Sequence, residues 1–397
     1  MHLNAKVGFK RAVVLAAGAA MVTFAFALRA TAQTVTASPI YDQSSNFPTN
    51  LPGIKTFAAP PAGFDPIAAT DNQLATYGFP PRPNAQADAE HYSMWKSAVA
   101  AANHRWSGAI QLTRYQSRPF HSAPAISAGS APSARPSGPT LGYSYNWSGY
   151  INTNNLTRWN SRDSFYLVMS DFNVPTAQQA FVANGFETGN ICDGDIDLQV
   201  SWNGIDGYSD QNALLQGGTL SGYACDLPEF GTGSVYFAWI EWAPAYPVIE
   251  IFPVNPGDDF YVATWATTPT RGYVFLDDLT TQTYGTFCIT SNGGPGLIGN
   301  SAEYIVERPA GDSTRLGLYP LANYVQDFWA ANWAYTYDQY RHNRPPTAYP
   351  GSNSSSNMVS YMVDDSGSYV ISYPQAEGSY GIFFQDYACA MVGGCTP

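Results

Sequence analysis

The stretch Ser301–Pro309 reads SAEYIVERP, and its alternation points to the fold class. Side chains of a β-strand point to opposite faces in turn, so Glu303, Ile305 and Glu307 share one face of this strand. The apolar residues between them share the other face. Neither face is plainly the one that meets water. An apolar strand that places two carboxylates on one side therefore needs an explanation.

Similar runs recur from Leu141 to the end of the sequence. They are rich in Tyr, Trp, Phe, Val, Ile and Thr, which favour strands, and Gly, Asn and Asp clusters separate them. The clearest are Asp163–Val174, Ser234–Pro244, Asp258–Thr268, Gly272–Thr280 and Gly367–Tyr373. We see no convincing amphipathic helix in this part. It predicts an all-β fold, a β-sandwich domain over residues 141–397.

The first 32 residues have the pattern of a secretory signal peptide. Lys6, Lys10 and Arg11 precede an apolar run over residues 12–28, and Ala30–Ala32 supplies a small-x-small cleavage site. We expect cleavage near Ala32 and a secreted, extracellular protein. A membrane anchor is the alternative, but the apolar run is short for a span.

Residues 33–140 read as a propeptide and a linker. This part begins with proline-rich sequence and ends with a linker rich in Ser, Pro, Ala and Gly. Between them, one helix is predicted at about Ala87–Ala102. The alternative is a secreted spacer without a regulatory role. We expect the cut that activates the protein in the linker, within residues 122–139.

Charge divides the chain at the same point. Residues 141–397 carry 25 Asp and Glu against seven Arg and no Lys, a formal charge of −18, whereas residues 33–140 carry a formal charge of +2. So acidic a domain argues against nucleic acid or an anionic membrane as partner. The acidic composition either serves solubility or adapts the domain to acid pH, where carboxylates are partly protonated and neutral.

Several chemistries are excluded by the residues that are missing. His342 is the only histidine after the linker, and the sequence has no G-x-S-x-G and no H-E-x-x-H. We expect no metal or other cofactor; a calcium site at Asp193, Asp195 and Asp197 is a weak alternative to a solvated acidic loop. Carboxylates, amides and aromatic side chains remain, and a carboxyl group with an amide can perform acid–base chemistry.

Five cysteines follow the linker, and export permits disulfides. Cys389 with Cys395, and Cys192 with Cys225 or Cys288, are the pairs that spacing allows. The odd number leaves one thiol over, and sequence alone leaves the pairing open.

Candidate functional residues gather in four segments. Trp147 lies in YNWSGY, Trp202 and Asp206 in SWNGIDGYSD, and Gln216 in the apolar run that ends in Gly-Gly. In Tyr236–Pro244, alternation places Phe237, Trp239 and Glu241 on one strand face. The fourth segment is the opening strand, with Glu303 and Glu307. Tryptophans of sandwiches usually belong to the core and strand glutamates usually face solvent, so each segment also has a plain structural explanation.

Together the segments NWSG, W-x-GIDG with LLQGG, AWIEW-x-P and AEYIVE-x-P resemble the glutamic peptidases, or eqolisins, in order and rough spacing. The resemblance runs from Tyr145 to about Tyr337 and more weakly beyond. It implies a sandwich of two large curved antiparallel sheets, secretion, and pepstatin-insensitive acid endopeptidase activity on polypeptides.

The resemblance also implies roles for the candidate residues. It assigns the catalytic dyad to Gln216 and Glu307, with Trp147, Trp202, Asp206, Trp239 and Glu241 in support and Glu303 as a neighbour. The two glutamates of the opening strand would then share a face because that face lines a cleft. We expect Glu307 to act as general base and then acid, and Gln216 to stabilise the oxyanion.

Three positions depart from the family pattern. Phe237 replaces a usual Asp, Ala243 replaces an aromatic residue, and Asp210 replaces a cysteine whose disulfide partner is also absent. Phe237 and Ala243 put substrate preference and the pH profile in question but leave the dyad in place.

Two other functions fit the same residues. A carbohydrate-active β-sandwich would use Glu241 and Glu307 as its carboxyl pair and the tryptophans as sugar platforms. A non-enzymatic sugar-binding protein would keep only the fold. For a peptidase we expect a monomer, with its own basic propeptide as inhibitor of the acidic domain, released as pH falls.

Overall fold

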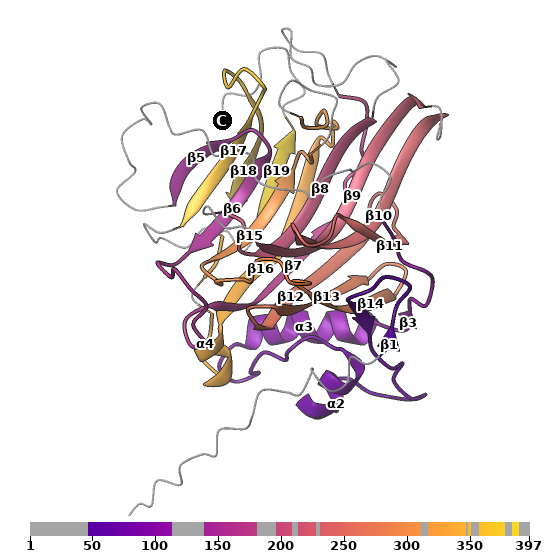
Figure 1. Ribbon diagram of the computed structural model, residues 1–397, viewed down its shortest axis with the longest axis vertical. Coiled ribbons are helices and arrows are strands. Elements are labelled where there is room, and N and C mark those ends of the chain that lie inside the picture. Colours follow the sequence, from indigo (N-terminus) through magenta and orange to yellow (C-terminus); the bar gives the residue numbers. More distant parts are fainter. Residues whose placement is uncertain are drawn as a thin grey trace, which may run out of the picture. The chain divides into compact units, whose positions relative to one another are not determined.

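β-Strands dominate the structure, a computed structural model that describes residues 47–112, 139–180, 196–208, 213–227, 231–310, 317–346, 348–350, 357–377 and 383–388 (Figure 1). All of these lie within one unit of the chain, Ser38–Pro397. The all-β prediction is confirmed. The predicted signal peptide and most of the predicted linker lie outside the described residues.

One set of antiparallel neighbours, here called the β7 group, runs in the order β14–β13–β12–β7–β16. Its strands were mostly expected from their aromatic and β-branched composition. Their bounds are β7 Phe165–Asn173, β12 Asp259–Thr268, β13 Arg271–Asp278, β14 Thr283–Thr290 and β16 Gln326–Thr336.

A second set, the β8 group, runs in the order β17–β6–β15–β8–β9–β10–β11, again antiparallel. Its bounds are β6 Trp147–Thr153, β8 Ile196–Ile205, β9 Leu214–Leu227, β10 Gly231–Ala243, β11 Ile249–Pro253, β15 Ser301–Glu307 and β17 Met358–Val363. β18 (Val370–Glu377) and β19 (Phe383–Ala388) continue the ladder from β17 to β16 and so join the two groups. β5 (Thr140–Ser144) pairs in parallel with β17.

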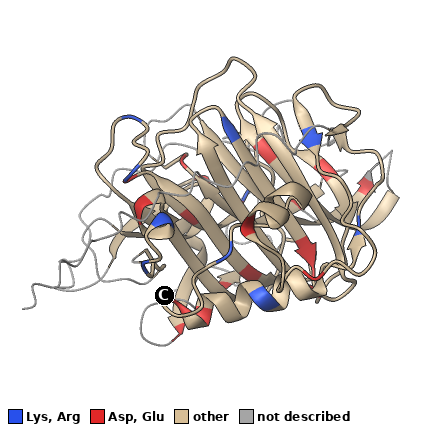
Figure 2. Cartoon of the chain, turned by 90° about the horizontal axis from the view of Figure 1, so that it is seen from below, with Lys and Arg blue, Asp and Glu red and all other residues tan. Residues whose placement is uncertain are grey.

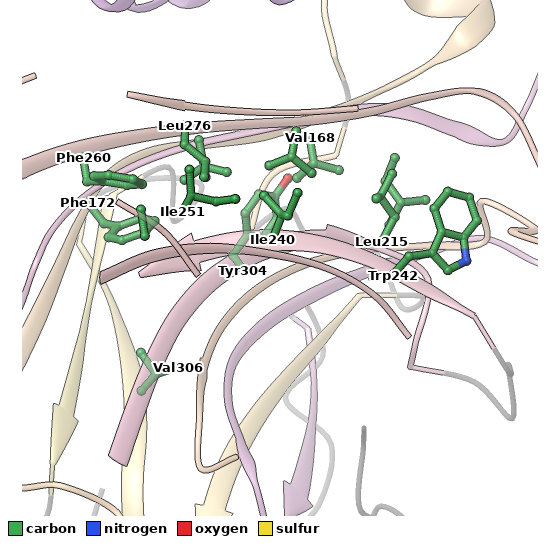
Figure 3. Packing of buried hydrophobic residues seen from close by; sticks show 14 of the residues in the cluster. Val168, Phe172, Leu215, Ile240, Trp242, Ile251, Phe260, Leu276, Tyr304 and Val306 are labelled. Atoms are coloured by element: carbon green, nitrogen blue, oxygen red, sulfur yellow. The ribbon is translucent and has the colours of Figure 1, made fainter. Parts of the chain in front are cut away.

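The main hydrophobic core contains buried side chains of both groups, which alternation directs to one face of each strand. Val168 and Phe172 of β7 share this cluster with Leu215 of β9, Ile240 of β10 and Tyr304 of β15 (Figure 3). A second cluster contains residues from the opposite face of the β7 group, and a third contains residues from the opposite face of the β8 group. Each group is therefore buried on both faces.

The described part of the predicted propeptide is folded. It contains β1 (Phe47–Pro48), β2 (Ile54–Thr56), α2 (Asp71–Tyr77), α3 (Ala89–Ala101), β3 (His104–Arg105) and β4 (Gln111–Leu112). The helix predicted near residues 87–102 is confirmed as α3.

Two short helices were not predicted. Both α2 and α4 (Tyr337–Arg341) start with a capping box, Thr70 with Gln73 and Thr336 with Gln339. The T-x-x-Q pattern was the signal for them in the sequence. Among the described residues no helix is long and apolar enough to span a bilayer. Cys288 is buried on β14, whereas Cys192, Cys389 and Cys395 lie outside the described residues, so the disulfide pairing stays a prediction.

Candidate active site

Strand register aligns three of the candidate polar residues in one row across the β8 group. Glu303 of β15 lies opposite Gly204 of β8, Gly204 lies opposite Gln216 of β9, and Gln216 lies opposite Glu241 of β10. Residues that lie opposite one another in neighbouring strands point to the same face of a sheet. Glu303, Gln216 and Glu241 therefore share a face, which follows from the register between strands.

The next two rows bring in the remaining residues of that face. The second row is Ile305, Trp202, Gly218 and Trp239, and the third is Glu307, Val200, Leu220 and Phe237, with Trp147 of β6 opposite Glu307. We call this face, with its three rows, the site face. Its apolar members, including all three candidate tryptophans, belong to one buried cluster.

Glu307 ends β15 as a buried carboxyl group with N–H donors on both oxygens. Its Oε1 accepts a hydrogen bond from the side-chain amide of Asn146 at 3.1 Å, and its Oε2 accepts one from the Trp202 indole at 2.8 Å. Burial raises the pKa of Glu307 to about 8, while these donors and the Trp147 indole pull it down. Among the described residues the Trp147 Nε1 has no hydrogen-bond partner of good geometry, so its effect on the pKa of Glu307 is through proximity.

Asn146 was not among the predicted site residues. It precedes β6 within the NWSG segment, of which only the tryptophan was predicted to belong to the site. Ser144 and Asn146 are also hydrogen-bonded to one another at 2.9 Å, which holds the amide in place. The motif was the available signal, but nothing in it says that the amide contacts a residue 161 positions later.

Two of the candidate tryptophans, Trp147 and Trp202, lie beside Glu307. The rings of Trp147 and Trp202 meet edge to face at 5.2 Å between centroids, and Trp239 is fully buried in the same cluster. Such edge-to-face pairs favour a fixed ring orientation. Trp202 is thus held both by the carboxyl group and by a neighbouring ring.

Gln216 is buried, and its amide is bound to Glu241. Its Nε2 donates to Glu241 Oε2 at 2.5 Å, while its Oε1 has no partner among the described residues. Since an amide nitrogen carries two hydrogens, one N–H is not used by this bond. Within the described part of the chain no hydrogen bond joins Gln216 to Glu307; they lie on one face, two rows apart.

Glu303 is fully buried in the first row. Neither carboxyl oxygen has a partner of hydrogen-bond geometry in the described residues. Burial raises its pKa well above the ordinary value, the nearby Ser301 hydroxyl lowers it, and the charge of Asp206 raises it further. Burial therefore favours the neutral, protonated form of Glu303.

The carboxylate of Asp206 is not part of the site face but binds a neighbouring loop. Its oxygens accept hydrogen bonds from the backbone N–H groups of Ile298, Gly299 and Asn300, at 2.6, 2.8 and 2.8 Å. Its backbone has a positive φ of 69°, and its own N–H donates to Ser301. Burial raises its pKa and these backbone donors lower it. Asp206 fixes the loop that leads into β15.

Of the three departures from the family pattern, Phe237 and Ala243 are buried, and Asp210 lies outside the described residues. Phe237 occupies the third row, beside Leu220, and Ala243 ends β10. His342 is the C-cap residue of α4, and its Nδ1 lies 3.1 Å from the Asp338 carboxylate. It is not a member of the three rows of the site face.

For the calcium alternative, Asp193 and Asp195 lie outside the described residues, and Asp197 accepts a hydrogen bond from the backbone of Ala180 at 2.8 Å. No cluster of three or more potential metal ligands occurs in the described part of the chain.

Sequence comparison gives a family match over residues 145–363, to the model described as the peptidase A4 family. Aspergillopepsin-2 from Aspergillus niger is 31% identical over 180 residues, 43% of this chain and 58% of that protein. Scytalidopepsin B from Scytalidium lignicola is 30% identical over 146 residues, 36% of this chain and 46% of that protein. The chain spans about half the length of the curated relatives it matches.

Two solved peptidase structures are partly similar to this chain. Scytalido-glutamic peptidase with a transition state analog inhibitor gives a TM-score of 0.43 at 20% identity, covering 62% of this chain and 98% of that one. Aspergilloglutamic peptidase from Aspergillus niger gives a TM-score of 0.39 at 22% identity, covering 48% of this chain and 99% of that one.

Proposed function

The chain belongs to the peptidase A4 family, and we propose that it is a secreted, acid-active endopeptidase of the glutamic type. One observation carries the proposal beyond the family match. A buried carboxyl group, Glu307, has N–H donors on both oxygens and shares a sheet face with the buried amide of Gln216. A carboxyl group and an amide suffice for general acid–base catalysis with oxyanion stabilisation.

In the proposed reaction Glu307 takes a proton from water, and the water oxygen attacks the carbonyl carbon of the scissile peptide bond. The C=O bond opens to an oxyanion, which the second N–H of Gln216 stabilises while the first stays on Glu241. Glu307 then gives its proton to the leaving nitrogen, and the C–N bond breaks. Glu241 serves to orient the amide.

The protonation of Glu307 sets a condition on this mechanism. With a pKa of about 8 in the described state, the group holds its proton throughout the acid range. Desolvation is the largest cause, so entry of water into the site lowers the pKa toward its usual value. Asn146 and Trp202 donate to the carboxylate form and favour its appearance. We propose that hydration of the site generates the base.

The aromatic members of the site face suit a polypeptide substrate. We propose that Trp147, Trp202 and Trp239 line the walls of a cleft that holds an extended peptide, and that Phe237 and Ala243 influence which side chains it accepts. In the same proposal the β7 and β8 groups are the two curved sheets of a sandwich. The geometry does not favour the carbohydrate-active alternative. That alternative uses Glu241 as one of its two carboxyl groups, and Glu241 is hydrogen-bonded to the Gln216 amide.

We also propose that the enzyme is a monomeric zymogen. Residues 1–32 would direct secretion, residues 33–140 would form the propeptide and linker, and a cut within residues 122–139 would activate the enzyme. Figure 2 shows where the Asp and Glu residues lie on the described chain. The formal charge of −18 over residues 141–397 supports a protein without nucleic acid or an anionic membrane as partner.

The test is digestion of a denatured protein at about pH 3–4, after acid incubation of the precursor and with pepstatin present. We expect cleavage by the wild type and at least a thousandfold loss in Glu307→Gln and Gln216→Ala. Glu377→Gln, which changes an exposed glutamate, is the matched control and keeps full activity. Full activity of Glu307→Gln in a folded, processed protein would exclude the proposed mechanism.

A further inference from the structure

The N-terminal segment, defined here as Phe47–Leu112, covers the face of the β7 group that points away from the main core. Leu74 of α2, Trp95 and Val99 of α3, and Phe57 and Phe79 of the connecting loops are all buried in the cluster on that face. Figure 1 shows α3 lying along this group. Most of the segment's buried residues therefore pack on the side of the β7 group that is opposite the main core, whereas Ile54 and Ile110 join the main core. None of the described residues of the segment belongs to the cluster on the site face.

Aromatic rings make most of this contact. Phe79 packs against Phe275 of β13 and Tyr284 of β14, with centroids 6.2 and 5.7 Å apart. Phe57 packs against Tyr273 at 6.0 Å. Without the segment these rings would form part of a contiguous exposed aromatic patch, and soluble monomers rarely carry large patches of this kind.

A buried polar cluster fastens α3 to β16. The Asp88 carboxylate accepts hydrogen bonds from the His91 ring at 2.6 Å and from the Tyr335 hydroxyl. The His91 ring also stacks on Trp333, with centroids 3.8 Å apart. The bond between Tyr335 and Asp88 exists only while α3 stays in place, so removing α3 deprives the Tyr335 hydroxyl of its partner.

Backbone pairing closes two sheet edges. β2 pairs with β14 in antiparallel register, β3 pairs with the same strand in parallel, and β4 pairs with β11. The hydroxyl of Thr286 on β14 also donates to the carbonyl of Gly78 at 2.7 Å. Because an open edge strand invites pairing with other chains, the segment protects the β7 group from aggregation.

From these contacts we infer that the N-terminal segment is a permanent structural chain of the mature protein, retained on the β7 group after the linker is cut. Retention is non-covalent, because every cysteine follows residue 191. The segment's ion pairs in the described residues are internal, Arg82 with Asp71 and His91 with Asp88, so acid does not break an ionic attachment to the rest. Activation then consists of cutting the linker, with no departure of the segment.

The experiment does not depend on peptidase activity. A recognition site for a sequence-specific protease is inserted between Gly129 and Ser130 of the full chain, in a Glu307→Gln background that prevents self-digestion. After the cut, gel filtration at pH 7 and pH 3.5 is followed by intact-mass analysis of each peak. We expect both pieces in one peak at both pH values. Two separate peaks, with residues from 130 onward still folded and monomeric, would overturn the inference.

Single substitutions identify which contact holds the N-terminal segment on the β7 group. Phe79→Ala removes the ring that packs on β13 and β14, and we expect the cut segment to dissociate at least tenfold faster. Phe47→Ala is the matched control, because this ring is 51% exposed, and it leaves dissociation unchanged. Thr286→Val, which loses only the bond to Gly78, is the milder variant if Phe79→Ala does not fold. An unchanged dissociation rate in both Phe79→Ala and Thr286→Val would contradict the proposed attachment.

Discussion

At the scale of single residues, the Trp202 indole stabilises the ionised form of Glu307, and this effect can be removed alone. In Trp202→Phe a smaller aromatic ring replaces the indole, and the N–H donor at 2.8 Å is lost. Losing a donor to the carboxylate raises the pKa of Glu307, so less base is present in acid. We expect the acid limb of kcat/KM to move up by about one pH unit, with a roughly tenfold loss at pH 4.

The control for this change is Trp242→Phe. Trp242 is as deeply buried, but it lies on the opposite face of β10, and its indole nitrogen has no partner in the described residues. Its replacement changes ring packing without touching Glu307, so the pH profile stays in place. A shift of equal size in both variants would mean that the profile reports general loosening of the fold.

Sequence alone predicted part of the candidate site for a simple reason. Alternation along one strand is local, so the shared faces of Glu303 with Glu307, and of Phe237, Trp239 and Glu241, could be stated in advance. The contact of Gln216 with Glu241 depends on the register between β9 and β10, which is not local. Asn146 was missed and the backbone contacts of Asp206 were not foreseen for the same reason.

At the scale of elements, β8 and β9 approach one another so closely that only glycine fits at one position of the site face. A Cβ on Gly218 would lie 1.9 Å from the carbonyl oxygen of Ser201 and 2.8 Å from the Cα of Trp202. We therefore expect Gly218→Ala to push the strands apart, to displace Trp202 from Glu307, and to cost about 2–3 kcal/mol of unfolding free energy. Denaturant unfolding measures this cost.

Gly233→Ala is the comparison within the neighbouring strand. Gly233 lies on β10, and a Cβ there meets nothing within 4 Å. Its replacement is expected to change stability by less than about 0.5 kcal/mol. Equal stability of the two variants would show that β8 and β9 can separate without cost, contrary to the close approach.

The positions of the strands in the sequence were easier to predict than the pairing of each strand with its neighbours. The runs around β7, β10, β12 and β13 were recognised from composition, because β-branched and aromatic residues suit a half-buried pleated surface. The short helices α2 and α4 have too few residues for an apolar period, and only their capping boxes marked them. The order of strands within each group follows from pairing between distant segments, which composition does not encode.

At the scale of the whole molecule, the N-terminal part differs most from its appearance in the sequence. Its proline-rich sequence and one predicted helix suggested a propeptide that would bind the acidic domain through its opposite charge. The described contacts are aromatic packing and edge pairing instead. The sequence offered Phe57, Phe79 and Trp95 as scattered aromatic residues, and only the fold assembles them on one surface. The boundary between residues 140 and 141 stays a prediction.

The buried carboxyl groups determine how stability changes with pH. Burial raises the pKa of Asp386 to about 6, even though three hydroxyl groups from Ser148, Tyr324 and Ser372 lower it. Burial together with the neighbouring Asp259 raises the pKa of Asp171 to about 8. In the unfolded chain these groups ionise near pH 4. Between pH 4 and about 8 the folded protein therefore binds more protons than the unfolded one, and its stability falls as pH rises.

We accordingly expect the protein to be most stable in acid, at or below about pH 4, and to lose stability steadily toward pH 8. The shift of Asp386 alone, about two pKa units, corresponds to roughly 3 kcal/mol. Calorimetry should give a Tm on the order of 10 °C higher at pH 4 than at pH 7. Asp386→Asn flattens the dependence between pH 4 and 6, whereas Asp163→Asn, at an exposed aspartate, leaves it unchanged. A Tm that rises from pH 4 to pH 7 would mean that paired carboxylates dominate instead, and the acidic composition would then serve solubility and not function in acid.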